Sequence, residues 1–335
     1  MSGVDQRSVA RSMTHDVGLR VDRARPLPVA NSPSIAILLC TYNGARFLSA
    51  QLATIERQSH TNWRLIVSDD GSTDETLAII RNFARRVPQS VELREGPQRG
   101  PCANFLGLAA DPSITGDYFA FSDQDDVWHE DKLARALNWL EKVPTIVPAV
   151  YGARTRLICA EGSPIGHSPR FSKPPSFSNA LVQSIAGANT MVFNVATKRL
   201  FNEAGPVDAI SHDWWAYQLV SGSSGLVHYD PEPHLDYRQH SGNRIGCNRG
   251  LRAQWKRFRM VLDGGFKVWN ETNLAALQRC RHLLTDDARA LLDTYDTVRT
   301  GSLPVRLKAL LNSGIRRQTL VGNLALLTAV VLKKL

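Results

Sequence analysis

The chain has 335 residues, of which 43% are hydrophobic and 21% charged, and it carries a formal net charge of +9 at pH 7. This size gives enough apolar material for the core of one large domain or two modest ones, and the composition is that of a globular protein rather than a disordered or fibrous one. The excess of cations predicts an anionic partner, such as nucleotide phosphates or a membrane face. Nucleic acid is not expected, because the sequence has neither zinc-finger spacing nor a basic and aromatic RNA-binding motif.

Residues 1–32 mix arginine with aspartate and lack the apolar stretch of a classical signal peptide, so we expect them to form a disordered tail. The five cysteines are odd in number and widely scattered, which favours a reducing compartment over a disulfide framework. No run of roughly 18 apolar residues occurs, so no membrane-spanning helix is expected. Together these features predict a cytoplasmic protein.

Strand-like and helix-like segments alternate four times in the first half of the chain. The predicted strands cover residues 35–40, 63–68, 90–93 and 118–121. This alternation predicts an α/β protein with a doubly wound, mostly parallel sheet and flanking helices. In such sheets ligands bind beyond the carboxyl ends of the strands. The polar residues expected at these ends are Thr41, Asn43, Asp70, Asp123 and Asp125.

The fourth predicted strand runs directly into three carboxylates, Asp123, Asp125 and Asp126. Carboxylates are almost never buried without a partner, so three at one strand end need a cation or solvent. An Asp-x-Asp pattern here can offer oxygen ligands to Mg²⁺ or Mn²⁺, which usually bind one or two carboxylates together with substrate phosphates. The alternative is a solvated acidic loop that precedes a helix with Leu133 and Leu137 on its apolar face.

The second predicted strand also ends in carboxylates, Asp69 and Asp70, before Gly71. Ordinary turn chemistry before a helix is the alternative to ligand binding here, and it suits Asp69 better than Asp70. Ser72 and Glu75 have the spacing of a capping box, which predicts the start of the next helix.

Further strands are expected at residues 151–160 and 188–194. Between them, residues 163–178 are rich in proline and serine, and we interpret them as a loop or a mobile flap. The helix that opens at His212 begins with an acid and two indoles, Asp213, Trp214 and Trp215. This pattern suggests a partly desolvated carboxylate beside a flat apolar platform, a suitable place for a general base next to a sugar ring. The alternative is that Asp213 caps the helix and the tryptophans belong to the core.

Two regions of positive charge follow. Arg238 and His240 lie in a loop containing glycine and could serve phosphate and metal, although a single histidine is often structural. Residues 303–335 hold six Lys or Arg and no acid, and they place Leu320, Leu324, Leu327 and Val331 on one helix face. Such a segment is suited to lying on an anionic membrane surface. A helix packed on the domain is the alternative.

These motifs occur in the order found in family 2 glycosyltransferases with the GT-A fold, and residues from about 34 to 246 resemble the rhamnosyltransferase-like bacterial branch of that family. The similarity lies in the first strand and turn, the nucleotide-binding turn, a nucleotide-side element, the Asp-x-Asp motif, the catalytic acid and a third metal-ligand position. The corresponding residues are 39–44, 67–74, 100–104, 122–128, 212–215 and 237–240.

The resemblance implies a GT-A glycosyltransferase domain at residues 33–246, with a nucleotide-binding half at 33–145 and an acceptor and catalytic half at 146–246. Residues 247–335 are then a helical C-terminal region that could associate with a membrane. The implied reaction is metal-dependent transfer of a sugar, with inversion, onto a hydroxyl of a glycan or lipid-linked glycan in cell-surface polysaccharide biosynthesis. The usual donor of the branch is dTDP-L-rhamnose, so the sugar expected to be transferred is L-rhamnose.

The resemblance also assigns roles to residues. Asp213 becomes the catalytic base, with Trp214 as a stacking surface for the acceptor. The implied ligands of Mg²⁺ or Mn²⁺ are Asp123, Asp125 and His240. The residues implied in nucleotide-sugar binding are Thr41, Tyr42, Asn43, Asp70, Asn104, Asp123 and Arg238.

Two other classes remain open from the sequence. A metal-dependent sugar nucleotidyltransferase also uses paired carboxylates on an α/β sheet, but it normally has a glycine-rich basic loop after the first strand, and residues 41–44 are not one. A non-catalytic glycan-binding protein on the same fold would not need the metal and base carboxylates together.

Overall fold

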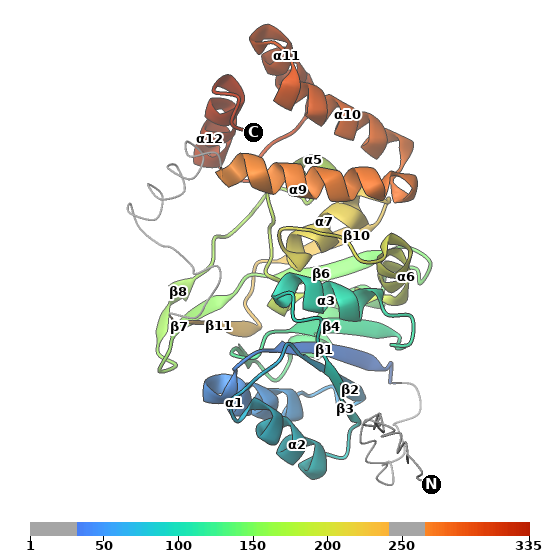
Figure 1. Cartoon of the computed structure of the whole chain (residues 1–335), viewed down its shortest axis with the longest axis vertical. Helices are drawn as coiled ribbons and strands as arrows, with labels where there is room; N and C mark the ends of the chain where they lie inside the picture. The colour runs from blue at the N-terminus through green and yellow to red at the C-terminus, as the bar shows by residue number, and fades with distance from the viewer. Residues whose placement is uncertain (1–31, 241–264) are drawn as a thin grey trace, which may run out of the picture.

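The computed structural model describes residues 32–240 and 265–335, so most of the expected N-terminal tail and residues 241–264 lie outside the described part. A seven-stranded sheet with the order β10-β6-β9-β4-β1-β2-β3 forms the centre of the molecule (Figure 1). Its strands are β1 (Ile35–Thr41), β2 (Trp63–Asp69), β3 (Val91–Glu95), β4 (Tyr118–Ser122), β6 (Ala149–Ala153), β9 (Val192–Asn194) and β10 (Leu226–Asp230). All neighbours are parallel except β9, which runs antiparallel to β4 and β6. The expected doubly wound, mostly parallel sheet is confirmed.

Helices cover both faces of this sheet, and the alternation along β1 shows why. Ile35, Ile37 and Leu39 share one buried cluster with α1, α2 and α4, whereas Ala36 and Leu38 share another with α3, α6 and α7. A central parallel strand is therefore apolar at every position, as its sequence predicts. These helices are α1 (Ala45–Glu56), α2 (Thr76–Arg86), α3 (Pro101–Ala110), α4 (Lys132–Leu140), α6 (Val195–Ala204) and α7 (His212–Gly222).

A second sheet of four short strands lies beside the first, in the order β5-β11-β7-β8. Its strands are β5 (Val127–Trp128), β7 (Arg156–Cys159), β8 (Pro164–His167) and β11 (Leu235–Gln239). The pairing of β11 with β5 brings the residues after position 235 against the end of the Asp-rich loop. The sequence does not predict this pairing, because the two strands are more than 100 residues apart.

Three predicted boundaries were wrong. The strand expected at 151–160 is divided, since β6 belongs to the large sheet and β7 to the small one. Residues 163–178 are not a plain flap: they contain β8 and the start of helix α5 (Phe177–Ala180). The strand expected from residue 188 begins with a 3₁₀ turn, Ala188–Thr190, before β9.

The described C-terminal residues are helical, as expected. They form α9 (Gly265–Arg279), a 3₁₀ turn (Arg281–Leu283), α10 (Asp286–Thr300), α11 (Leu303–Ser313) and α12 (Leu320–Val331), which gather beyond α7 at one end of the molecule (Figure 1). Leu277, Leu292 and Val330 belong to the same buried cluster as the α7 residues, so these helices share the core of the domain. Among the described residues, no helix combines the length and apolar character needed to cross a membrane.

Candidate active site

The carboxyl ends of β1, β2 and β4 meet at one edge of the sheet. Thr41 pairs in register with Asp69, and Leu39 pairs with Ser122, the residue before Asp123. The side chains at this edge are joined by hydrogen bonds between loops. The edge is therefore a connected framework rather than a set of independent turns.

Asp69 has a structural role in this framework. Its carboxylate accepts hydrogen bonds from Thr41 Oγ1 (2.7 Å), Ser72 Oγ (2.6 Å) and the backbone N–H of Ser72 (2.7 Å). Thr41, a predicted nucleotide ligand, is buried and uses its hydroxyl here. The expected capping box is wrong, because Ser72 contacts Asp69 and α2 begins at Thr76 without a side-chain cap.

Asp70 and Asn43 connect the neighbouring loops. Asp70 accepts hydrogen bonds from the backbone N–H groups of Gln98 (2.6 Å) and Gly100 (2.8 Å), and thus fixes the loop before α3. Asn43, whose φ of 46° lies in the left-handed region, accepts from the backbone N–H of Thr73 (2.9 Å). Both predicted residues lie at the expected edge.

Gln124, which the sequence analysis did not single out, joins the Asp-rich loop to the end of β1. Its side-chain amide accepts from Tyr42 N (2.9 Å) and donates to Tyr42 O (3.0 Å). A Cβ on Gly44 would lie 2.2 Å from Gln124 Oε1, so only glycine leaves room for this contact. The Tyr42 side chain is 58% exposed and remains available to a ligand.

The acids of the Asp-rich loop repel one another in a poorly solvated place. Burial, followed by the charges of Asp125 and Asp213, raises the pKa of Asp123 to about 7. Burial and the charges of Asp125 and Asp123 also raise the pKa of Asp126 well above its usual value. Asp126 is fully buried and accepts hydrogen bonds from Asn189 Nδ2 (2.6 Å) and Arg238 N (3.2 Å). Raised carboxyl pKa values of this kind are typical of sites that receive a cation or a proton.

A buried lysine lies at the start of α4, next to this loop. Lys132 is 2% exposed, and its Nζ lies 3.6 Å from the centre of the Trp128 ring. Burial lowers the pKa of its ammonium to about 7, while the charges of Asp126 and Asp123 act in the opposite direction. Lys132 thus partly offsets the negative charge of the loop.

β11 brings Arg238 and His240 to the acids. His240 Nε2 lies 2.7 Å from Asp125 Oδ2, and the imidazole packs on Phe47 at 4.8 Å between ring centroids. The Arg238 guanidinium donates to the backbone carbonyls of Asp125 (3.0 Å) and Ala160 (2.8 Å), and the residue is 7% exposed. These bonds fix the loop, and the phosphate-binding role of Arg238 remains a prediction.

Asp213 lies in the first turn of α7 and faces the same acids. Its Oδ2 accepts from Ser184 Oγ (3.1 Å), and its charge reaches Asp123. His212 stacks on Phe105 at 4.1 Å, and burial lowers its pKa to about 4, so it is neutral at physiological pH. The flat platform expected from the indoles is wrong: Trp214 and Trp215 are 5% and 0% exposed, and Trp214 Nε1 donates to Ala180 O (2.6 Å).

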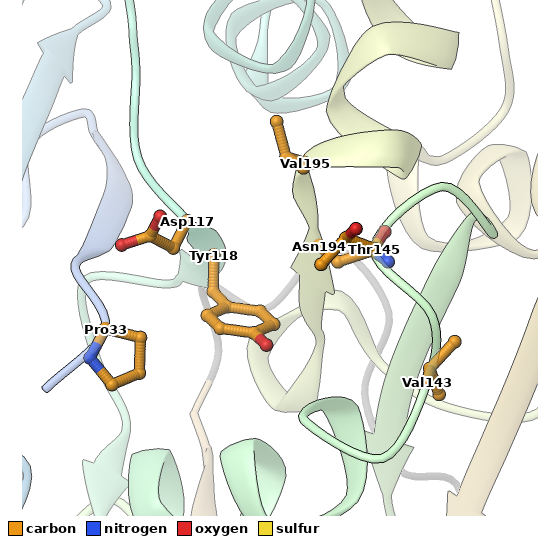
Figure 2. A pocket seen from close by; sticks show the side chains of 7 residues that line it. All are labelled: Pro33, Asp117, Tyr118, Val143, Thr145, Asn194 and Val195. Carbon is orange, nitrogen blue, oxygen red and sulfur yellow. The ribbon is translucent and has the colours of Figure 1, made fainter. Parts of the chain in front are cut away.

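Two cavities flank the sheet. The one in Figure 2, of about 190 Å³, lies at the amino ends of β1 and β4, where Tyr118 faces Pro33 and Asn194. That is the edge opposite the acids, so it does not fit a ligand of the parallel sheet. The other cavity, of about 680 Å³, lies along α3 and includes Ser68 and Asn104. Asn104 is buried, its Nδ2 donates to Ser68 O (3.0 Å), and its Oδ1 has no hydrogen-bond partner among the described residues.

Comparison with known proteins identifies the domain that holds this sheet edge. Residues 36–175 match the model of glycosyl transferase family 2. This chain carries a family 2 glycosyltransferase domain. Among its relatives, the dTDP-rhamnosyl transferase RfbG of Shigella flexneri is 27% identical over 240 residues, or 68% of this chain and 81% of that protein. An uncharacterised glycosyltransferase of Haemophilus influenzae is 37% identical over 112 residues, or 33% of this chain and 43% of that protein.

One solved structure with a similar course is the mannosyltransferase PcManGT from Pyrobaculum calidifontis in complex with GDP-Man and Mn²⁺. It shares 18% identity with this glycosyltransferase and has a TM-score of 0.48, with 91% of this chain and 86% of that chain covered.

The family implies a divalent cation, and the donor set of this glycosyltransferase fits one. Asp125 and His240 direct an oxygen and a nitrogen at each other across 2.7 Å, and the neighbouring acids have raised pKa values. Within the described ranges, no three His, Cys, Asp or Glu side chains gather as a complete ligand set, and the role of Asp123 as a third ligand stays a prediction. Mg²⁺ usually binds one or two carboxylates together with substrate phosphates, so a single protein carboxylate such as Asp125 is compatible with a cation at this edge.

Proposed function

We propose that this glycosyltransferase transfers a sugar, with inversion, from a nucleoside diphosphate donor to an acceptor hydroxyl, with Asp213 as the base. The observation that supports the proposal is that Asp125, which His240 contacts, and Asp213 both lie near enough to Asp123 for their charges to raise its pKa. When bound by Asp125 and His240, a divalent cation would supply positive charge to the leaving diphosphate. The nucleotide would lie among Tyr42, Asn43, Asp70 and Asn104.

Asp213 is suited to proton removal because its carboxylate is oriented and not consumed by an ion pair. The hydrogen bond from Ser184 fixes one oxygen, and none of the ion pairs between described residues involves Asp213. A base in this position would accept the proton of the acceptor hydroxyl as the hydroxyl oxygen attacks the anomeric carbon. The bond from that carbon to the diphosphate breaks in the same step, which inverts the configuration.

The donor is proposed to be dTDP-L-rhamnose. The support is the similarity to the rhamnosyl transferase of Shigella flexneri, which extends over most of both chains. The acceptor is proposed to be a hydroxyl of a glycan or lipid-linked glycan of the cell surface, and the enzyme is proposed to work at the cytoplasmic membrane face.

A donor-hydrolysis assay tests the reaction and the donor together. Purified full-length protein is incubated with dTDP-L-rhamnose, UDP-GlcNAc or GDP-mannose, each with Mn²⁺ and with EDTA. We expect release of dTDP from dTDP-L-rhamnose that requires the metal. Release from another donor would correct the sugar, and metal-independent release would contradict the cation site. Formation of pyrophosphate with a sugar phosphate and dTTP would instead indicate a nucleotidyltransferase.

A further inference from the structure

The connection between α11 and α12, residues 315–319, crosses the domain and is tied to its catalytic half; we call it the strap. Its Gln318 is 7% exposed and pairs with the Lys173 peptide in both directions. Gln318 Oε1 accepts from Lys173 N (3.1 Å), and Gln318 Nε2 donates to Lys173 O (3.1 Å). The Gln318 side-chain amide thus makes the two hydrogen bonds that a neighbouring strand would otherwise make to the Lys173 backbone.

The strap also holds residues 179–184, the segment that follows Lys173 along the chain. Arg317 donates from its guanidinium to Val182 O (2.7 Å), and Gln318 N donates to Gln183 Oε1 (2.9 Å). Asn179 Nδ2 donates to Arg316 O (2.9 Å). These bonds join positions about 135 residues apart in the chain, so they form only when the C-terminal helices are docked.

On its other side the same segment contacts α7, the helix that carries Asp213. Ala180 O accepts from Trp214 Nε1 (2.6 Å), and the Tyr217 hydroxyl donates to Asn179 Oδ1 (3.0 Å). At the end of the segment, Ser184 Oγ donates to Asp213 Oδ2 (3.1 Å). Residues 179–184 are therefore held between the strap and the helix of the proposed base.

We propose that Arg317 and Gln318 are positioning residues for the reaction, acting through Ser184 on the Asp213 carboxylate. The inference rests on the proposed role of Asp213 as base. Without the strap the segment would lose these three hydrogen bonds, and a small displacement of Ser184 would release the carboxylate into other rotamers. Misplacement of a reacting group by about 1 Å can cost as much as 10²-fold in rate.

The test separates positioning from stability. Ser184→Ala in the full-length enzyme is expected to lower kcat roughly ten-fold, the loss of one hydrogen bond to a charged group, with donor KM unchanged. Ser184→Thr retains the hydroxyl and should restore most of the rate. Gln318→Ala should lower kcat less than Ser184→Ala, and the double variant should be no slower than Ser184→Ala, because both act through one hydrogen bond.

The matched control is Thr319→Ala, which removes the side-chain cap of α12 next to Gln318 and should leave kcat unchanged. If Gln318→Ala does not fold, Arg317→Met takes its place, since it removes the guanidinium that donates to Val182 O and keeps a long side chain. A lower melting temperature with full kcat in these variants would overturn the proposal. If Asp213→Asn lowers kcat while Ser184→Ala and Gln318→Ala do not, only the positioning inference fails. If Asp213→Asn is fully active, the proposed function of Asp213 fails first.

Discussion

Neighbouring carboxylates have different roles in this protein because their oxygens contact different groups. Asp69 accepts from hydroxyl and backbone donors of a turn, and Asp126 is fully buried against Asn189 and the Arg238 backbone. Among the described residues, the Asp125 carboxylate instead contacts the His240 side chain, and the Asp213 carboxylate contacts the Ser184 side chain. The acids whose oxygens accept the fewest of these hydrogen bonds are therefore those proposed for metal binding and catalysis.

Replacing the proposed base should slow the chemical step alone. We expect Asp213→Asn to lower kcat by ~10²–10⁴-fold, because the amide cannot accept the proton, while donor KM changes little. Steady-state kinetics with a saturating acceptor measure both quantities. Asp287→Asn is the control, since Asp287 is an exposed acid in the first turn of α10. Weakened donor binding with normal kcat would move Asp213 to the nucleotide side.

The buried imidazole of His212 should make the fold sensitive to acid. Burial lowers its folded pKa to about 4 from the ordinary value of 6.5, so between these values the unfolded chain binds a proton that the folded chain does not. The stability that comes from keeping His212 neutral is fully present above pH 6.5 and is lost as the pH falls towards 4. At pH 5 the loss is on the order of 2 kcal/mol of unfolding free energy. Asp123, whose pKa is raised to about 7, acts in the opposite direction.

His212→Phe isolates the histidine from the other titrating groups. Phenylalanine can keep the stacking on Phe105, and His212 Nε2 has no hydrogen-bond partner in the described residues that would be lost. Urea unfolding of the wild type and of His212→Phe at pH 7 and pH 5 measures the effect. The free energy of unfolding should fall less between these pH values in the variant than in the wild type. Equal losses would mean that His212 is not buried neutral in solution.

At the scale of elements, α12 has apolar side chains on two faces. Leu326, Ala329 and Val330 are buried in the core, as the packed-helix alternative requires. Leu320, Leu324, Leu327 and Val331, the stripe found in the sequence, are 81%, 65%, 40% and 44% exposed. Of the cations in this region, Arg306 is buried and donates to Val330 O, while Lys308 and Lys333 are exposed. The helix is thus packed on the domain and still exposes an apolar face, and the exposed Lys333 follows two residues after its end.

This face is expected to bind anionic membranes. Apolar side chains would enter the interface, and each nearby Lys or Arg adds ~1 kcal/mol that salt screens. Leu320→Ser with Leu324→Ser should reduce co-sedimentation with anionic liposomes several-fold and leave the core intact, and raised salt should weaken wild-type binding. Ile146→Ser, a residue that is also 81% exposed but lies between α4 and β6, is the control. Equal binding by the double variant and wild type would contradict a membrane role for α12.

For the whole molecule, donor and metal binding should raise the stability of the domain by linkage. A ligand at 100 times its Kd adds about 2.7 kcal/mol to the free energy of unfolding. We expect dTDP-L-rhamnose with Mn²⁺ to raise the melting temperature of the wild type by a few degrees, more than either alone. Asp125→Ala should remove this synergy, whereas Asp117→Ala, an acid at the opposite sheet edge that accepts from Ser34, should keep it. Synergy that survives in Asp125→Ala would place the metal elsewhere.

The sequence by itself determined the elements whose signals are local. Continuous apolar runs predicted β1, β2 and β4, and carboxylates at their ends predicted one functional edge, because parallel strands place their carboxyl ends together. The opening of α7 at His212 was predicted correctly, and so was the placement of Leu320, Leu324 and Leu327 on one face of a helix, since helical periodicity depends on neighbouring residues.

Only the tertiary structure decided which of these residues meet. Gln124 closes on Tyr42, β11 carries His240 to Asp125, and the strap reaches residues 173–184. The tryptophans beside Asp213 are core residues rather than a platform, because the C-terminal helices and α5 cover them. Each of these contacts joins positions far apart in the chain, and its energy comes from burial and hydrogen-bond satisfaction in the folded domain. A pattern of neighbouring residues in the sequence therefore does not identify such partners.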